Sequence, residues 1–285
     1  MTATTNFPRV WLITGASRGF GLRIARAALA RGDAVVATAR NVATLAALGD
    51  APGLLPLALD VTDEAQAQTV AQAAIARFGR IDVLVNNAGF GLLGAVEEAS
   101  GDEVRRLYET NVFGLLNVTR AVLPGMRARR AGHVLNFSSV GGLRSGPGFG
   151  VYCSTKFAVE GLSEALHAEL APLNVHVTVI EPGYFRTEFL ESNSLVVSPR
   201  ELEDYAATAG QVRAAARRIS LNQPGDPDKL VTAVLQLADA STPPRRLPLG
   251  TDTLAVLDAR GAELQEETQA WRAVSASTDF AAPAA

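Results

Sequence analysis

The sequence predicts an α/β protein, a single doubly wound domain in which helices cover both faces of a mainly parallel β-sheet. Short apolar runs alternate with longer amphipathic stretches along most of the 285 residues. A glycine-rich turn follows the first apolar run, and no apolar run reaches the roughly 18 residues of a membrane span. Apolar strands separated by helices of about a dozen residues are typical of βαβ units, whose parallel sheet is buried on both faces.

The apolar runs predict six strands, in chain order. They are Val10–Thr14, Ala34–Ala39, Leu54–Asp60, Asp82–Asn87, His133–Ser139 and Val175–Gly183. Pro56 makes the third strand begin late or places it at an edge, because proline cannot donate to a central ladder. The amphipathic stretches predict helices at Leu22–Gly32, Asp63–Phe78, Gly101–Arg130, Val151–Leu173 and Pro227–Ala240.

Two segments stand outside this alternation within the predicted domain of residues 1–285. Residues 184–226 form a long excursion after the carboxyl end of a strand, which predicts a substrate lid. The alternative is a helical insertion that only packs. Residues 250–285 form a C-terminal extension with a candidate helix at Leu254–Val274, to which the sequence assigns no role.

The composition argues against several classes of protein. The net charge of −3 offers no basic surface for nucleic acid. The single cysteine, Cys153, excludes an intramolecular disulfide and a cysteine-based zinc cluster, and the three histidines lack ligand spacing, so no metal is expected. The N-terminal MTATTNFPRV does not resemble a secretory signal. We therefore expect a cytoplasmic protein without a membrane span.

The first strand runs into TGASRGFG, residues Thr14–Gly21. Gly15, Gly19 and Gly21 allow a tight turn, close approach of a ligand and close packing of helix on strand. The helix that follows offers backbone N–H groups to a pyrophosphate. Because the turn stands at the first strand-to-helix crossover, it predicts a dinucleotide site.

A second motif predicts proton transfer. Among the 26 basic residues only Lys156 and Lys229 are lysines, and Lys156 stands four residues after Tyr152, on the same face of a predicted helix. An unperturbed tyrosine, with a pKa of about 10, gives up its proton poorly near neutral pH. A nearby ammonium group favours the phenolate and is expected to lower the pKa of Tyr152.

Together these motifs resemble the short-chain dehydrogenase/reductase family, in its compact branch and its hydroxysteroid and retinol dehydrogenase-like group. The resemblance runs from about Arg9 to Ala240. It includes the spacing G-x-x-x-G-x-G, NNAG at Asn86–Gly89, and PGYFRT at Pro182–Thr187. It implies a Rossmann fold and an oxidoreductase that interconverts a ketone or aldehyde and an alcohol by hydride transfer.

The resemblance also implies the roles of individual residues. Tyr152 is the acid/base, Lys156 holds the nicotinamide ribose, Ser139 (or its neighbour Ser138) bonds the substrate oxygen, and Asn111 holds a water in a proton relay. The implied cofactor-binding residues are Gly15, Ser17, Arg18, Gly19, Phe20, Gly21, Arg40, Asp60, Val61, Asn87, Ala88, Gly89, Tyr152, Lys156, Pro182, Gly183 and Thr187. Asn86 is expected to tie the sheet together.

The end of the second strand bears on the choice of cofactor. An acid there would bind the ribose of NAD, but this chain has Ala39 followed by Arg40. Arg40 and Arg18 could pair with a 2′-phosphate, so we expect NADP(H) and regard NAD(H) as the alternative.

Apolar residues near the expected site suggest a hydrophobic small-molecule substrate. With Ser139 and Tyr152, the predicted substrate-binding residues are Leu143, Phe149 and Phe185. Two other functions stay open: an NAD(P)-binding regulatory protein, and an extended-family enzyme acting on nucleotide sugars. The stretches Gly101–Arg130 and Val151–Leu173 resemble the family's oligomerisation helices, which implies a homodimer or homotetramer.

Overall fold

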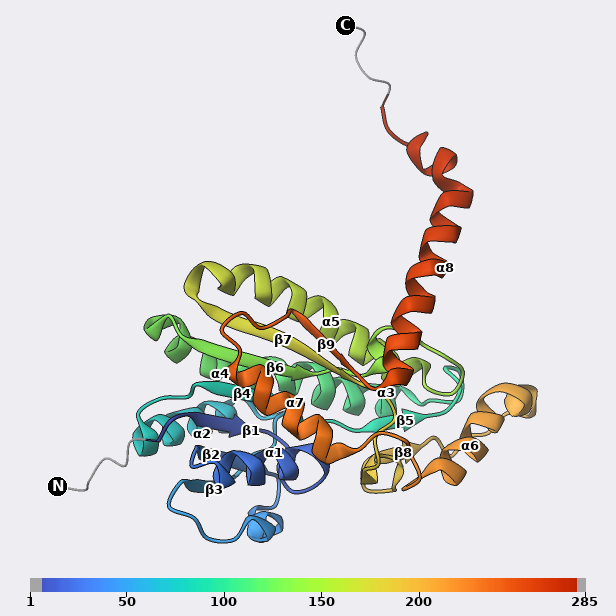
Figure 1. Ribbon diagram of the computed structural model, residues 1–285. Helices are drawn as coiled ribbons and strands as arrows, with labels where there is room; N and C mark the ends of the chain where they lie inside the picture. The colour runs from blue at the N-terminus through green and yellow to red at the C-terminus, as the bar shows by residue number, and fades with distance from the viewer. Residues whose placement is uncertain (1–6, 281–285) are drawn as a thin grey trace, which may run out of the picture.

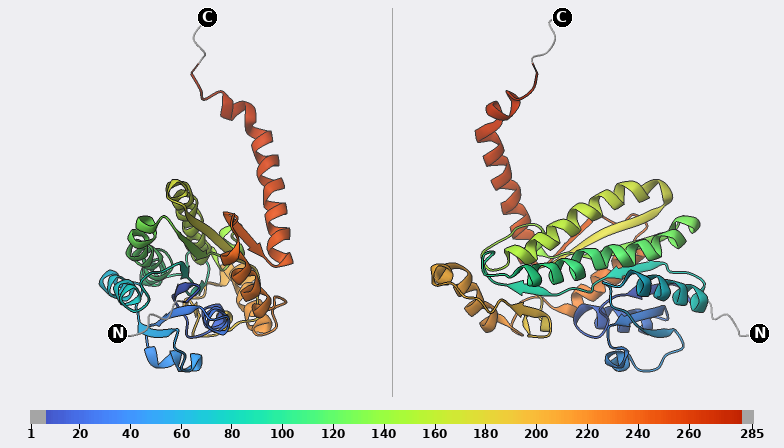
Figure 2. Two further views of the ribbon diagram at one scale, coloured as in Figure 1. Left: turned by 60° about the vertical axis from the view of Figure 1, so that its left-hand side comes forward. Right: turned by 180° about the vertical axis from the view of Figure 1, so that it is seen from behind.

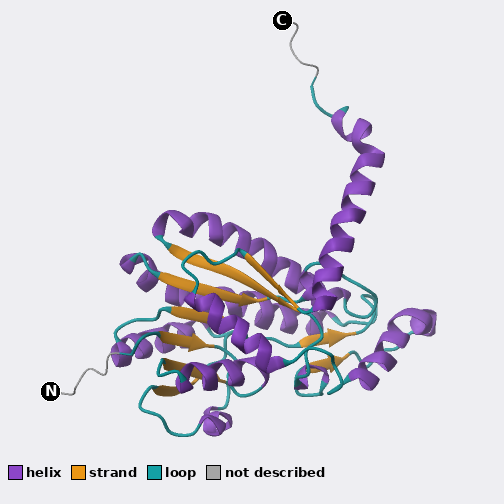
Figure 3. Ribbon diagram, viewed as in Figure 1, coloured by secondary structure: helices purple, strands orange, loops and turns teal. Residues whose placement is uncertain are grey.

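A computed structural model describes residues 7–280 of the chain. Seven parallel strands form one sheet in the order β3-β2-β1-β4-β6-β7-β9 (Figure 1 and Figure 3). They are β1 (Val10–Ile13), β2 (Ala34–Ala39), β3 (Leu54–Ala58), β4 (Val83–Asn86), β6 (Gly132–Phe137), β7 (Val175–Pro182) and β9 (Arg246–Leu249). The strand order changes direction between β1 and β4, and in such sheets ligands bind in the crevice beyond the carboxyl ends of the strands.

Helices cover both faces of this sheet, as predicted. One face carries α1 (Gly19–Ala30) and α7 (Pro227–Asp239), and the other carries α2 (Glu64–Phe78), α4 (Gly114–Arg129) and α5 (Gly150–Leu170).

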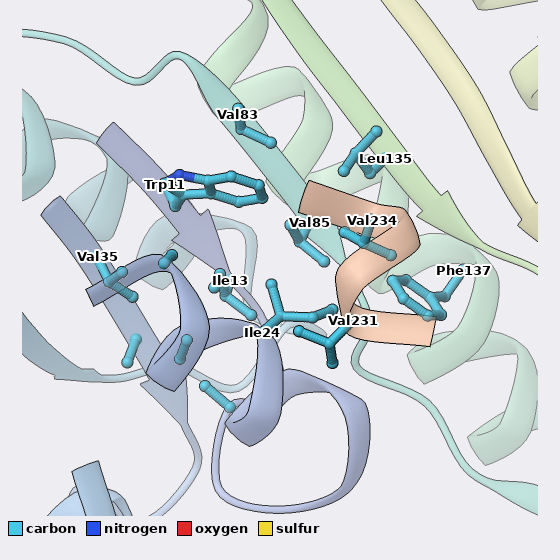
Figure 4. Close-up of a cluster of buried hydrophobic side chains, with 14 of the residues drawn as sticks. Trp11, Ile13, Ile24, Val35, Val83, Val85, Leu135, Phe137, Val231 and Val234 are labelled. Atoms are coloured by element: carbon cyan, nitrogen blue, oxygen red, sulfur yellow. The ribbon is translucent and has the colours of Figure 1, made fainter. Parts of the chain in front are cut away.

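Side chains along each strand alternate between the two cores. Trp11 and Ile13 of β1 belong to the core under α1 and α7, whereas Leu12 belongs to the core on the opposite face. In Figure 4, Ile24 of α1 and Val231 of α7 lie over the strands in the first of these cores. Both faces of the sheet are therefore buried, as the continuous apolar runs predict.

The strands differ from the prediction at the edges. β3 is an edge strand, which agrees with Pro56, although it begins at Leu54. β9 forms the opposite edge and was not predicted, because RLPL is short and contains Pro248. A separate two-stranded parallel sheet, β5 (Gly91–Leu93) with β8 (Leu195–Val197), was also missed, since three residues give no readable period.

The predicted helices are present with altered ends. α1 begins at Gly19, three residues before the predicted start, because the glycine-rich turn itself enters the helix. The predicted helix over Gly101–Arg130 is divided into α3 (Gly101–Tyr108), a π-helical turn at Glu109–Phe113, and α4. Such turns insert an extra residue into a helix and are frequent at functional sites.

The excursion over 184–226 contains β8 and α6 (Gln211–Ile219). The pairing of β8 with β5 holds this segment beside the carboxyl end of the main sheet. The C-terminal extension forms α8 (Thr251–Ala276), which leaves the body after β9 (Figure 1). Residues 281–285 of the predicted extension lie outside the described residues.

Candidate active site

A cavity of about 1120 Å³ opens at the carboxyl ends of the strands. The predicted site residues that line it are Gly15, Ser17, Arg18, Gly19, Phe20, Arg40, Asp60, Val61, Asn87, Ala88, Ser139, Phe149, Tyr152, Pro182, Gly183, Phe185 and Thr187. Five predicted residues do not line it: Gly21, Gly89, Asn111, Leu143 and Lys156. The structure therefore brings most of the predicted residues to one cavity and leaves five of them out of its lining.

The glycine-rich turn forms one end of the cavity. Gly15 and Gly19 have φ angles of +64° and +55°, in the left-handed region that side chains disfavour. A Cβ atom on Gly21 would lie 2.4 Å from the Gly15 carbonyl oxygen, so only glycine permits this approach of helix and turn. Among the described residues, no side chain caps the N-terminus of α1. The cradle, with its free backbone N–H groups, fits a pyrophosphate.

Asn87 fixes this turn against β4. Its Nδ2 donates to the carbonyl oxygens of Thr14 (2.9 Å) and Gly15 (3.1 Å). In return, the Thr14 hydroxyl accepts from the backbone N–H groups of Asn87 and Ala88. Sequence reasoning expected Asn87 to contact the cofactor and missed its role in holding the turn.

Asn86 ties two strands and a helix together, as predicted. Its Nδ2 donates to Asn136 Oδ1 on β6 and to the Thr119 hydroxyl on α4, each at 2.9 Å.

Two arginines lie where β2 ends. Arg40 is exposed and follows Ala39, while Arg18 Nε donates to the Ser194 hydroxyl at 3.0 Å. The Arg18 guanidinium also donates to the Asn193 carbonyl oxygen. Burial and the positive charge of Arg40 lower the pKa of Arg18. The excursion therefore holds one of the two cations, a role of Ser194 and Asn193 that the sequence did not reveal.

Tyr152 and Ser139 stand together at the other end of the cavity. Tyr152 is only 7% exposed. Burial raises the pKa of its phenol, and a hydrogen bond with Ser139 acts in the opposite direction. This differs from the lowered pKa that the sequence predicts. The phenol therefore keeps its proton near neutral pH and is in the form that can donate it.

Burial is the main cause of this raised pKa of Tyr152, and Lys156 does not offset it. Lys156 Nζ donates to the Phe137 carbonyl oxygen at 2.8 Å and lies 5.7 Å from the centre of the Tyr152 ring. The ammonium thus approaches the ring, and its hydrogen bond is to the backbone. Burial lowers the pKa of Lys156 to about 8, opposed by the negative charge of Glu160.

Asn111 lies in the π-helical turn, and its amide bonds within the chain. Nδ2 donates to the Phe90 carbonyl oxygen (2.9 Å), and Oδ1 accepts from the Phe90 N–H (3.1 Å). This pairing fixes the loop after β4 against the helix. A water-holding role for Asn111 stays a prediction.

The substrate end of the cavity is apolar. The ring of Tyr152 packs against Phe149 and Phe189, with centroids 6.0 and 5.6 Å apart. Phe185 lines the cavity and also packs on Phe20 in the core. Leu143 is buried outside the cavity wall, so its predicted contact with substrate is not part of this arrangement. Leu195, Val196, Val212 and Val256 also line the cavity, and sequence reasoning did not name them as substrate contacts.

Sequence reasoning also missed a buried pair of acids next to the site. Glu160 is on α5, one turn after Lys156, and Glu181 is on β7. Arg246 on β9 pairs with Glu181 at 2.6 Å and with Glu160 at 3.1 Å. Burial, together with the charge of Glu181, raises the pKa of Glu160 to about 7. Only contacts across α5, β7 and the unpredicted β9 reveal this group.

The buried acid predicts how stability depends on pH. The folded protein binds a proton at Glu160 more tightly than the unfolded chain, whose carboxyl has a pKa of 4.5. Its stabilising contribution is therefore complete below that pH and is lost as the pH rises through about 7. We expect Glu160→Gln to flatten the fall in unfolding free energy over this window, measured by urea denaturation.

The control is Glu164→Gln, which removes an exposed carboxylate from the same helix. It should leave the pH profile unchanged. Equal slopes for Glu160→Gln and the unmodified protein would contradict the prediction.

Comparison with known proteins identifies the family. A family model described as short chain dehydrogenase matches residues 9–196. This match spans well over half of the chain. The chain belongs to the short-chain dehydrogenase family.

The family relatives extend over nearly the whole chain. Oxidoreductase BOA17 of Botryotinia fuckeliana is 38% identical over 94% of this chain and 98% of its own length. The 3-ketodihydrosphingosine reductase of Bacteroides thetaiotaomicron is 36% identical (85% and 88%), and human retinol dehydrogenase 8 is 37% identical (84% and 80%).

Solved structures of the family agree with the fold. A short-chain dehydrogenase from Streptomyces avermitilis has a TM-score of 0.87 at 43% identity, covering 95% of this chain and 99% of its own. A Burkholderia phymatum family member in complex with NAD has a TM-score of 0.77 at 25% identity (98% and 99%). A serine dehydrogenase complexed with NADP⁺ has a TM-score of 0.71 at 31% identity (84% and 94%).

Two further observations bear on the site. Within residues 7–280, the side chains of His, Cys, Asp and Glu form no group of three or more that could hold a metal ion. No helix in this part of the chain combines the length and apolar character needed to cross a bilayer.

Proposed function

We propose that the protein is an NADP(H)-dependent oxidoreductase that interconverts a hydrophobic ketone or aldehyde and the corresponding alcohol. One observation carries the proposal: Ser139 and Tyr152 line the same cavity as the glycine-rich turn, and Arg18 of that turn and Arg40 line it too. When bound, the nicotinamide cofactor supplies or accepts the hydride. Solved relatives that hold NAD or NADP support a nicotinamide cofactor here.

The chain's own residues supply the proton and the orientation. The Ser139 hydroxyl is placed to bond the substrate oxygen, and Tyr152 to give that oxygen its proton. Lys156 Nζ lies 5.7 Å from the centre of the Tyr152 ring, so its contact with Tyr152 is through the ring. Asn111 holds the neighbouring loop, so that the wall of the cavity keeps its shape.

The two arginines favour a cofactor with a 2′-phosphate. Each guanidinium repels the other, and a phosphate dianion between them would relieve that repulsion while accepting their hydrogen bonds. The uncharged Ala39 adds no repulsion against the anion. These features support NADP(H) over NAD(H).

A ketone panel followed by NADPH oxidation at 340 nm tests this function. We expect reduction of apolar ketones, with kcat/KM at least about tenfold higher for NADPH than for NADH. Arg40→Ala should narrow that ratio, because it removes one of the two phosphate partners. Arg26→Ala is the matched control, since Arg26 bonds the Ala47 carbonyl and does not line the cavity. Equal use of both cofactors by the unmodified protein would overturn the NADP preference.

The apolar walls support a hydrophobic substrate. Two relatives are named for 3-ketodihydrosphingosine and for retinol as their substrates. The excursion over 184–226 supplies much of this wall, and we interpret it as a substrate lid.

Two finer points belong to the same proposal. Phe113 in the π-helical turn and Phe157 on α5 are 49% and 43% exposed, which supports a homodimer or homotetramer through these helices. We also propose a cytoplasmic location, with which the buried free thiol of Cys153 is compatible.

A further inference from the structure

The proximal part of α8 is anchored to the body. Thr253 is buried, and the Asp252 carboxylate accepts the Tyr184 N–H at 2.7 Å. Glu263, three turns into the helix, pairs with Arg144 at 2.8 Å. Val256, between them, lines the active-site cavity. These contacts fix the direction in which the rest of the helix leaves the body.

The distal part of α8 has no such contacts. Every side chain from residue 264 to residue 280 is exposed. Figure 1 and both views of Figure 2 show this part projecting away from the sheet and its helices. A helix of 26 residues spans about 39 Å, and helices in proteins are stabilised mostly by packing of one face. The projecting part therefore lacks the packing that normally stabilises a helix.

The exposed helix carries an apolar seam with a seven-residue period. Its large members are Leu254 (48% exposed), Leu257 (38%), Leu264 (46%) and Trp271 (66%). Leu257, Leu264 and Trp271 follow one another at intervals of seven, and Leu254, Gly261 and Thr268 fill the position three residues before each. Apolar residues repeating on average every 3.5 residues form the contact line of a two-helix coiled coil.

We propose that α8 binds α8 of a second copy of this chain, with the two helices antiparallel. In that arrangement Leu254 of one copy faces Trp271 of the other, and Leu257 faces Thr268. Leu264 then faces Gly261, where the absence of a side chain makes room for it. In each of these facing pairs, a large apolar side chain of one copy packs against the residue opposite it in the other copy.

The charges that flank the seam are complementary in the same register. Asp258 of one copy lies opposite Arg272 of the other, and Arg260 lies opposite Glu267. Symmetry repeats both pairs, so the antiparallel dimer has four flanking pairs of opposite charge and none of like charge among these residues. Flanking charges of this kind set the orientation of paired helices.

A parallel pair fits the sequence less well. It would place Gly261 against Gly261 and Trp271 against Trp271, which leaves a void in one layer and crowds another. Asp258 would face Thr253, so only the pairing of Glu267 with Arg272 would join opposite charges. Both packing and charge therefore favour the antiparallel arrangement.

Disulfide cross-linking tests the pairing directly and does not depend on catalysis. Leu254 and Trp271 are 17 residues apart on one helix, roughly 25 Å, so cysteines there cannot join within a chain. We expect mild oxidation of the full-length variant Leu254→Cys/Trp271→Cys to give a cross-linked dimer on non-reducing gels. Each single variant, and the unmodified protein with its buried Cys153, should stay uncross-linked.

Other results overturn the proposal. Cross-linking of either single variant with itself would show a parallel pair. Absence of cross-links in the double variant would show that α8 packs on its own body or pairs with nothing. Mixing the two single variants should restore the cross-link if the pairing is antiparallel.

A charge exchange provides an independent readout. Asp258→Arg should weaken the α8 contact at least tenfold, measured as cross-linking yield against protein concentration in the double-cysteine background. Adding Arg272→Asp should restore it, because the exchanged pair is again of opposite charge. The matched control is Glu266→Arg, on the outer face of the helix, which should change little. Failure of the second exchange to restore the contact would contradict this register.

Discussion

Replacing Tyr152 with phenylalanine is expected to lower kcat for carbonyl reduction by about 10²- to 10⁴-fold, the range over which a positioned acid contributes. The substitution removes only the hydroxyl that would protonate the substrate oxygen. The aromatic ring stays packed between Phe149 and Phe189, so the cavity should keep its shape. Steady-state kinetics with NADPH and a responsive ketone provide the measurement.

Cofactor binding separates this effect from a general loss of structure. The dissociation constant for NADPH, measured by fluorescence titration, should change by no more than about twofold, because the glycine-rich turn and the arginines lie elsewhere in the cavity. Tyr205→Phe is the control, since Tyr205 bonds Glu97 and does not line the cavity. Normal binding together with an unchanged rate in Tyr152→Phe would refute the mechanism.

Replacing Lys156 with arginine is expected to lower kcat/KM by about 10²-fold, although the charge is kept. The lysine is 8% exposed, and its compact ammonium fits between the Tyr152 ring and the Phe137 carbonyl oxygen. A planar guanidinium has more atoms and a fixed fork of donors, so it must displace one of these neighbours. Misplacement by about 1 Å near reacting groups costs that much in rate.

The second lysine provides the matched control. Lys229 is exposed in the first turn of α7, beside the capping residue Asp226. Lys229→Arg is therefore expected to retain full activity and stability. Circular dichroism of both variants shows whether the fold is kept, and similar activities for the two would contradict the role assigned to Lys156.

The fold could be predicted because its signals are local. Buried parallel strands are apolar, as throughout β1, and the helices between them have readable periods and caps such as Asp63 before α2. The edge strand β9 was missed because its partner β7 is distant in sequence and its own four residues include Pro248. The small strands β5 and β8 are defined only by their pairing.

The same distinction holds for the site: residues in local sequence motifs could be predicted, and contacts between distant residues could not. Gly15, Ser139, Tyr152 and Thr187 belong to contiguous motifs, and the structure brings them to one cavity. The hydrogen bond from Arg18 to Ser194 joins residues 176 positions apart, and no spacing rule predicts it. The pKa of Tyr152 could not be predicted either, because it depends mainly on how deeply the phenol is buried.

The start of α8 places a limit on where the chain can be shortened. A Cβ atom on Gly183, in the loop expected to meet the nicotinamide, would lie 2.3 Å from the Asp252 carboxylate. That carboxylate supports the loop from behind by accepting the Tyr184 N–H. A truncation before Thr251 would remove this support, whereas one after Glu263 would spare it. The first part of α8 thus belongs to the frame of the candidate active site, whereas the second part, exposed from residue 264 onward, can be removed without touching that frame.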